Sequence, residues 1–199
     1  EMVAQRLGCA VEDILAKDLF LVNRQQGCVW GFDKEFVSTP KLDDLQCAFV
    51  ALKGLLEAAP NDACVNVVAL FDNEEVGSNT KQGAMSTFLH DVLVRMNAAL
   101  GKGEQDYYRA VAKSFLVSCD NAHAVHPNIP GKTDDCNKAK LSGGPVIKEA
   151  ANQKYTTDAF SRAVFTALCK KAGIPLQTFA NRSDVAGGST LGNLSYTQV

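Results

Sequence analysis

Three acidic residues crowd into the four positions Asp72-Asn73-Glu74-Glu75, directly after an apolar run that starts at Val65. A short run so rich in valine is typical of a strand buried on both faces. Crowded carboxylates repel one another, and a multivalent cation nearby relieves that repulsion. Neighbouring side chains at a strand end point in different directions, so one glutamate can bind metal while the other serves as a base. A solvated acidic turn explains the same residues, and this segment alone leaves both interpretations open.

Carboxylates also stand at two other places where the chain is expected to turn. Asp43 and Asp44 begin a helix that the apolar spacing predicts to about residue 59. One of them can cap the helix, which leaves the other as a possible metal ligand. Asp120 follows a short apolar strand, and His123 and His126 come after it. Histidines in a loop are more often structural than ligands, but beside the first acidic strand end they favour a metal site.

The elements expected to position these acids alternate between strands and helices. Strands are predicted over residues 65–70, 114–118, 143–148 and 176–180, with a hairpin formed by 19–22 and 28–32. Helices are predicted over residues 45–59, 80–100 and 156–172, and a last helix after a glycine-rich turn at 181–192. This alternation predicts one α/β domain over residues 1–199 with a mostly parallel central sheet. Ligand sites in such sheets gather beyond the carboxyl ends of the strands.

Composition excludes several classes of protein. The 199 residues are 46% hydrophobic and 21% charged with a net charge of −2, which argues against nucleic acid or an anionic membrane as a partner. No apolar run approaches the roughly 20 residues of a membrane span, and no signal peptide opens the chain. The 7 cysteines are scattered and odd in number, which indicates reduced thiols and a cytoplasmic location. No glycine-rich nucleotide motif is present.

Several carboxylates and a few imidazoles, without a nucleophilic serine or cysteine motif, indicate metal-assisted hydrolysis. Two cations about 3.5–4 Å apart can polarise a carbonyl and lower the pKa of a shared water. A glutamate that does not bind metal can take the proton of that water and pass it to a leaving amine.

Five segments together resemble the aspartyl aminopeptidase and aminopeptidase I family of metallo-aminopeptidases. They run in order over nearly the whole chain, at residues 41–45, 71–78, 118–128, 144–148 and 182–190. The resemblance implies a three-layer α/β/α sandwich with two Zn²⁺ ions, although Co²⁺ or Mn²⁺ also suit such sites. It also implies peptide substrates, cleaved at their amino ends, and a homo-oligomer in the form of a tetrahedral dodecamer.

Roles follow from the resemblance, position by position. Asp43 is expected to bridge the two metals, with Glu75 as a ligand of one and Asp120 as a ligand of the other. Glu74 is expected to be the general base. The substrate-binding residues are expected to be Lys148, which suits an acidic amino-terminal residue, and His123, Asp184, Gly187 and Gly188.

The chain also departs from the family pattern. The family takes a histidine ligand from near each end of the full sequence and carries an inserted dimerisation domain, and none of these is present. We therefore expect part of a catalytic domain, with weak metal binding and little activity on its own. Two alternatives remain: a related co-catalytic zinc exopeptidase or deacylase, and a non-catalytic assembly subunit. Retention of both Glu74 and Glu75 speaks against the second.

Overall fold

The computed structural model describes residues 1–185, 187 and 188, and the helix predicted after the glycine-rich turn lies outside them. The chain divides into two compact units, Glu1–Leu42 and Asp43–Val199. Among the described residues, no helix has the length and apolar character needed to cross a membrane.

The first unit contains a short helix and a β-hairpin. Helix α1 (Met2–Leu7) is followed by the 3-10 turn η1 (Val11–Asp13), and strand β1 (Cys28–Trp30) pairs antiparallel with β2 (Phe36–Ser38). The predicted pairing of residues 19–22 with 28–32 is therefore wrong. Trp30 explains the choice of partner, because its ring stacks on Phe36 at 4.6 Å and its Nε1–H donates to Ser38 Oγ at 2.7 Å.

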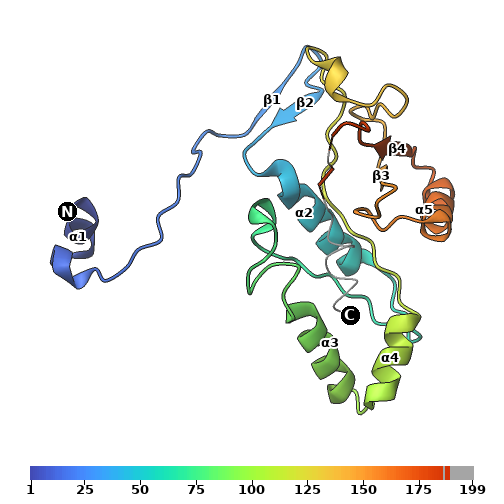
Figure 1. Cartoon of the computed structure of the whole chain (residues 1–199), viewed down its shortest axis with the longest axis horizontal. Helices are drawn as coiled ribbons and strands as arrows, with labels where there is room; N and C mark the ends of the chain where they lie inside the picture. The colour runs from blue at the N-terminus through green and yellow to red at the C-terminus, as the bar shows by residue number, and fades with distance from the viewer. Residues whose placement is uncertain (186, 189–199) are drawn as a thin grey trace. The chain divides into compact units, whose positions relative to one another are not determined.

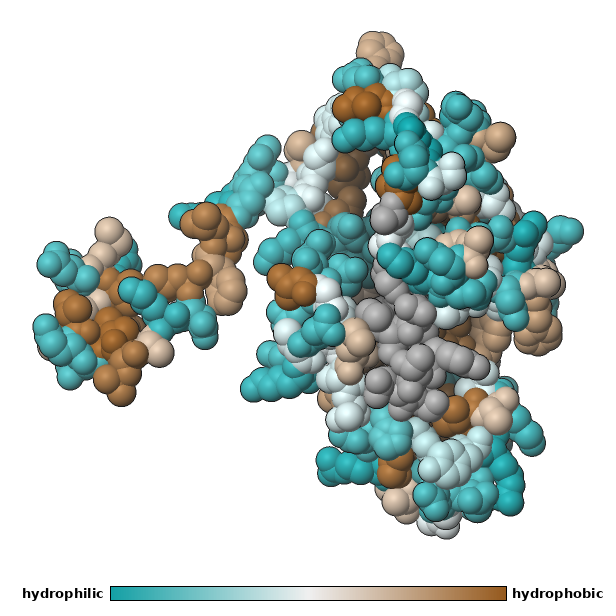
Figure 2. All heavy atoms as spheres, in the orientation of Figure 1, coloured by the Kyte–Doolittle hydropathy of each residue, from teal (hydrophilic) through white to brown (hydrophobic). Residues whose placement is uncertain are grey.

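Residues 19–22 instead expose their apolar side chains, and Phe20 is 84% exposed. Figure 2 shows apolar side chains at the surface around α1 and along the segment that follows it.

Helices dominate the described part of the second unit (Figure 1). They are α2 (Leu42–Glu57), α3 (Phe88–Ala99), α4 (Glu104–Ala112) and α5 (Ala159–Ala172). Three of them, α2, α3 and α5, overlap the helices predicted over 45–59, 80–100 and 156–172. The prediction that α3 starts at Thr80 is wrong, because residues 78–87 form turns. Gly83 explains the departure: a Cβ there would lie 2.1 Å from the carbonyl oxygen of Ser78, so the chain folds back too closely for a regular helix.

One parallel strand pair is formed, as predicted, around helix α5. Strand β3 (Val146–Glu149) pairs with β4 (Gln177–Ala180), with Lys148 opposite Phe179. Asp158 caps α5, since its carboxylate accepts from the backbone N–H of Ser161 at 2.7 Å. Gly173 ends the helix with a φ of 67°. This β–α–β segment fixes the position of Lys148 at the carboxyl end of β3.

The described residues 65–70 and 114–118 are not assigned as strands. Both are strongly apolar, yet Val65 is 60% and Val117 51% exposed. A strand requires a hydrogen-bonded neighbour, and the strand pairs of the described residues are β1–β2 and β3–β4. The α/β character of the chain is thus seen, whereas the three-layer sandwich with a central sheet stays a prediction.

Candidate metal centre

Three aspartates meet in the second unit. Asp43, Asp44 and Asp120 each offer a carboxylate oxygen, and these three oxygens lie within 4.8 Å of one another. Asp43 and Asp44 are exposed and Asp120 is half-buried. We call this group the aspartate cluster. It joins residues that are far apart in the sequence, as expected for acids at separate turns of an α/β fold.

The start of α2 presents the first two aspartates. Asp43 and Asp44 have φ/ψ angles of −83°/111° and −119°/27°, so neither is helical although both fall within the bounds of α2. The peptide bond between them is cis. Because the helix proper begins only after Asp44, both carboxylates can face the same small volume. Sequence reasoning treated one of the pair as a helix cap, and the adjacency of the two acids was the signal for the second.

Asp120 is held by Lys148, which comes from β3. The Lys148 ammonium donates a hydrogen bond to Asp120 Oδ2 and lies 3.5 Å from the carbonyl oxygen of Asn121. The Lys148 side chain is 16% exposed and that of Asp120 is 32% exposed, so water screens this ion pair only in part. The Tyr155 ring, whose centroid lies 5.8 Å from Nζ, covers the ammonium further.

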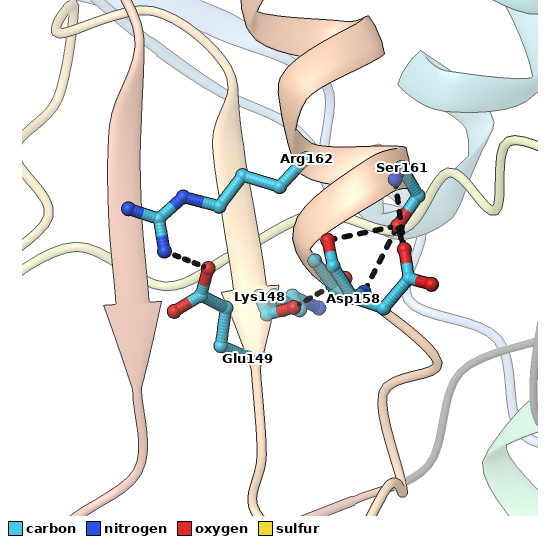
Figure 3. Close-up of polar contacts among 6 residues, drawn as sticks. Lys148, Glu149, Asp158, Ser161 and Arg162 are labelled. Atoms are coloured by element: carbon cyan, nitrogen blue, oxygen red, sulfur yellow. Dashed lines mark hydrogen bonds and ion pairs between the residues drawn. The ribbon is translucent and has the colours of Figure 1, made fainter.

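Residues in α5 and just before it hold the backbone around Lys148 in place. Thr157 Oγ1 donates to the Lys148 carbonyl oxygen at 2.8 Å, and Arg162 of α5 pairs with Glu149 at 2.8 Å. Figure 3 shows both contacts beside the capping interactions of Asp158 and Ser161. Lys148 is therefore anchored on both its backbone and its side chain.

Glu74 and Glu75 lie in a tight turn. They open the 3-10 turn η2 (Glu74–Val76), which starts after Asn73 in the left-handed conformation (φ 60°). Asn73 is held in place because its Oδ1 accepts from Thr80 Oγ1 at 2.9 Å and its carbonyl accepts from the N–H of Ser78 at 2.9 Å. Ser78 is only 2% exposed. These contacts hold the turn in place, and both glutamates are exposed.

Electrostatic coupling links Glu74 to the aspartate cluster. Partial burial raises the pKa of Glu74 above its ordinary value, and the charges of Glu75, Asp120, Asp43 and Asp44 raise it further. Burial likewise raises the pKa of Asp44, against a hydrogen bond from Cys47 that lowers it, and the charges of Asp120 and Asp43 add to the rise. A carboxylate whose pKa moves toward neutrality beside other acids is the environment that suits a general base.

The donor set fits a divalent cation. Carboxylate oxygens bind Zn²⁺ as well as harder divalent ions, and three acids so close together bring a charge that a cation would offset. Asp43 and Asp120, two of the three predicted ligands, belong to the aspartate cluster. Glu75, the third, lies outside that group, and Asp44 takes its place there. The ligand roles of all these residues stay predictions.

The predicted substrate residues are distributed around the second unit. The exposed His123 meets Phe179 of β4 edge-on at 5.2 Å. Gly187 lies so close to Asn181 that a Cβ added to Gly187 would be 2.1 Å from Asn181 Nδ2. The carbonyl oxygen of Gly187 accepts a hydrogen bond from the Lys154 ammonium at 3.1 Å. Gly188 has open space around its Cβ position. Asp184 is engaged by the Arg182 guanidinium, which holds the pKa of the Asp184 carboxyl below its ordinary value.

A pocket adjoins Asp120 and Lys148. It has a volume of about 170 Å³ and is bounded on one side by residues 115–118 and on the other by the start of α5. Its polar lining residues include Ser118, Tyr155, Thr157 and Ser161. Asp120 thus belongs both to the aspartate cluster and to the lining of this pocket, which Lys148 also lines.

The family model of the aminopeptidase I zinc metalloproteases (M18) matches residues 1–199. The chain belongs to this family. It is 48% identical over 197 residues to the probable M18 family aminopeptidase 2 of Clostridium novyi, covering 99% of the chain and 45% of that protein. It is 36% identical over 203 residues to the aspartyl aminopeptidase of Caenorhabditis elegans, covering 100% of the chain and 43% of that protein.

Solved structures agree with this assignment. The chain is 28% identical to the S. cerevisiae mApe1 dodecamer with a TM-score of 0.79, covering 99% of this chain and 44% of that one. It therefore spans less than half the length of each of these M18 proteins. The resemblance seen in the sequence is confirmed, and the fold is that of M18 aminopeptidases, which are α/β proteins.

Proposed function

We propose that the complete protein carrying this chain is a zinc-dependent aminopeptidase that removes amino-terminal residues from peptides. The observation that carries the proposal is the convergence of Asp43, Asp44 and Asp120, with Glu74 electrostatically coupled to them. Membership of a zinc metalloprotease family supports it. We assign two Zn²⁺ ions to the site, held by Asp43, Asp120 and Glu75, with Asp44 beside them.

The division of labour follows from the chain's own residues. Bound divalent cations supply Lewis-acid polarisation of the scissile carbonyl and a more acidic water. Glu74 would accept a proton from a water at the site and return it to the leaving amine. Its raised pKa makes the Glu74 carboxylate a stronger base than an ordinary glutamate, which favours the first of these transfers. Gly188 leaves room for a peptide backbone to approach, since nothing lies within 4 Å of its Cβ position, and Gly187 is assigned to the same turn.

Acidic amino-terminal residues are the substrates that Lys148 favours. Its ammonium has three N–H donors, so it can keep Asp120 while it binds a substrate carboxylate. Several relatives are named aspartyl aminopeptidases, which supports this preference. The exposed residues His123 and Asp184 are assigned to substrate contact.

The larger architecture follows from the relatives. We propose the three-layer α/β/α sandwich with a mostly parallel sheet, in which residues 65–70 and 114–118 are strands of the complete domain. The parallel pairing of β3 and β4 supports this arrangement. A homo-oligomer of the tetrahedral dodecameric type is supported by the similarity to the mApe1 dodecamer. The reduced cysteines favour the cytoplasm.

Replacement of Glu74 tests the proposal directly. In the complete protein, Glu74→Gln should lower kcat about 10²–10⁴-fold on aminoacyl-p-nitroanilides, because it removes the base. Zinc content, measured by mass spectrometry of the purified protein, should stay at the wild-type value. Glu57→Gln, which changes an exposed glutamate at the end of α2, is the matched control and should leave both unchanged.

Three results would contradict the proposal. A wild-type protein that holds no zinc, or a Glu74→Gln variant as active as wild type, would indicate a non-catalytic subunit of the same fold. Activity on acylated amino acids but not on free amino ends would instead indicate a deacylase.

A further inference from the structure

Cys47 lies beside two parts of the aspartate cluster, the Asp43–Asp44 pair and the segment of Asp120. It stands in the first turn of α2, three residues after Asp44. Its thiol donates to Asn121 Oδ1 at 3.3 Å and also hydrogen-bonds the Asp44 carboxylate. The backbone N–H of Asn121 donates to that same carboxylate. One side chain and one backbone amide thus connect the Asp43–Asp44 corner to the Asp120–Asn121 corner.

We propose that Cys47 is a positioning residue of the metal centre. It holds the two corners at the separation that lets Asp43 and Asp120 reach the same cation. The inference rests on the proposed function, because it concerns the same site. Hydrogen-bonded groups around metal ligands orient those ligands, and their mutation typically weakens metal affinity about 10–100-fold.

The thiol acts here as a hydrogen-bond donor. Burial raises the pKa of Cys47 to about 12, and the carboxylate of Asp44 raises it in the same direction. A thiol with such a pKa keeps its proton at neutral pH, so it can donate to an oxygen acceptor. The thiolate needed for metal ligation or nucleophilic attack is disfavoured for the same reason. Cys47 therefore supports the site without taking part in the chemistry.

Serine and alanine replacements separate this role from simple packing. Serine keeps a donor of similar size, whereas alanine removes the donor and leaves both acceptors without it. Loss of such a supporting hydrogen bond typically weakens metal affinity 10–100-fold, and a weak sulfur donor should lie near the lower end, at about 10-fold. Cys169→Ala is the matched control, since Cys169 is a buried thiol on α5.

The experiment measures the zinc dissociation constant of the complete protein by competition with a chromophoric chelator. Cys47→Ala should bind zinc about 10-fold more weakly than wild type, while Cys47→Ser and Cys169→Ala should bind within about a factor of three. Asn121→Ala removes the acceptor from the other corner and should weaken zinc binding in the same direction. It provides the measurement if Cys47→Ala does not fold.

The outcomes distinguish this inference from the proposed function. Zinc binding by Cys47→Ala and Asn121→Ala that equals wild type would overturn the positioning role alone. Cys47→Ser as weak as Cys47→Ala would also overturn it, because the donor would then be irrelevant. Failure of the wild-type protein to bind zinc would overturn the proposed function, and the positioning role with it.

Discussion

The charge of the aspartate cluster predicts that the effect of Asp44→Asn on stability changes sign when zinc binds. Asp44→Asn removes one of three carboxylates whose oxygens lie within 4.8 Å of one another, and it preserves shape and hydrogen-bonding oxygen. Without metal, the variant should unfold less easily than wild type. With zinc bound, it should be the less stable of the two, because a negative charge that attracts the cation is gone.

The size of the effect follows from Coulomb's law. Two unit charges 4.8 Å apart interact with about 0.9 kcal/mol at the dielectric constant of water and about 3.5 kcal/mol at an effective value of 20. Asp43 and Asp44 are exposed, so the lower figure applies, and Asp44 is repelled by two neighbours. Lys148 pairs with Asp120 and so offsets part of the repulsion between Asp120 and Asp44. We expect a net gain of about 1 kcal/mol in the free energy of unfolding of the metal-free variant.

A pH series adds a second signature. The pKa of Asp44 is raised above its ordinary value of 3.8, so the folded protein binds this proton more tightly than the unfolded chain does. Metal-free wild type should therefore gain stability as the pH falls from neutral through the raised pKa to 3.8. The advantage of Asp44→Asn should shrink over the same interval.

The assay is urea unfolding of the complete protein in chelator and in saturating zinc. Asp62→Asn, an exposed aspartate in the turn after α2, should show neither the gain nor the reversal. If Asp44→Asn destabilises the metal-free protein, or if zinc leaves the difference from wild type unchanged, the crowding argument is refuted.

Two further predictions concern the region of β3 and α5. Lys148→Met should lower kcat/KM for substrates with an acidic amino-terminal residue by about 10–100-fold more than for neutral ones, as expected for loss of a charged hydrogen bond; an equal loss for both classes would contradict the assigned preference. Asp158→Ala should lower the urea midpoint by removing the α5 cap, and the difference from wild type should disappear as the pH falls from 3.8 through the lowered pKa of Asp158. A difference that persists at low pH would show that the cap does not act through the carboxylate.

Local spacing predicted the elements that contain their own stabilising contacts. The helix from Asp158 to Gly173 has a capping aspartate and a terminal glycine in its sequence, so both ends could be found within about three residues. The hairpin was misassigned because several apolar segments had similar strand character. The contact that decides between them, Trp30 on Phe36, depends on which residues meet across the turn.

The apolar segments 65–70 and 114–118 show a different limit of sequence reasoning. A run of valines identifies residues suited to a buried sheet, but it contains no information on which strands lie beside them. The strand pairing of a central sheet is non-local, so it depends on neighbours that are distant in the sequence. Asp120, which follows the second of these segments, nevertheless lies beside Asp43 in the aspartate cluster, although the strand that was expected to place it there is not formed in the described residues.

The presence of Asp44 rather than Glu75 in the aspartate cluster shows why residue types were easier to predict than their grouping. In both cases two acids are adjacent in the chain, and either can face the cation. The backbone differs between the two places: Asp43 and Asp44 are both non-helical and their oxygens lie within 4.8 Å of each other and of Asp120, whereas Glu74 and Glu75 open a 3-10 turn after the left-handed Asn73 and lie outside this group. Those angles are fixed by contacts such as Thr80 to Asn73, seven residues apart. Under the positioning role that we propose for Cys47, a side chain outside the chemistry decides which acids lie together.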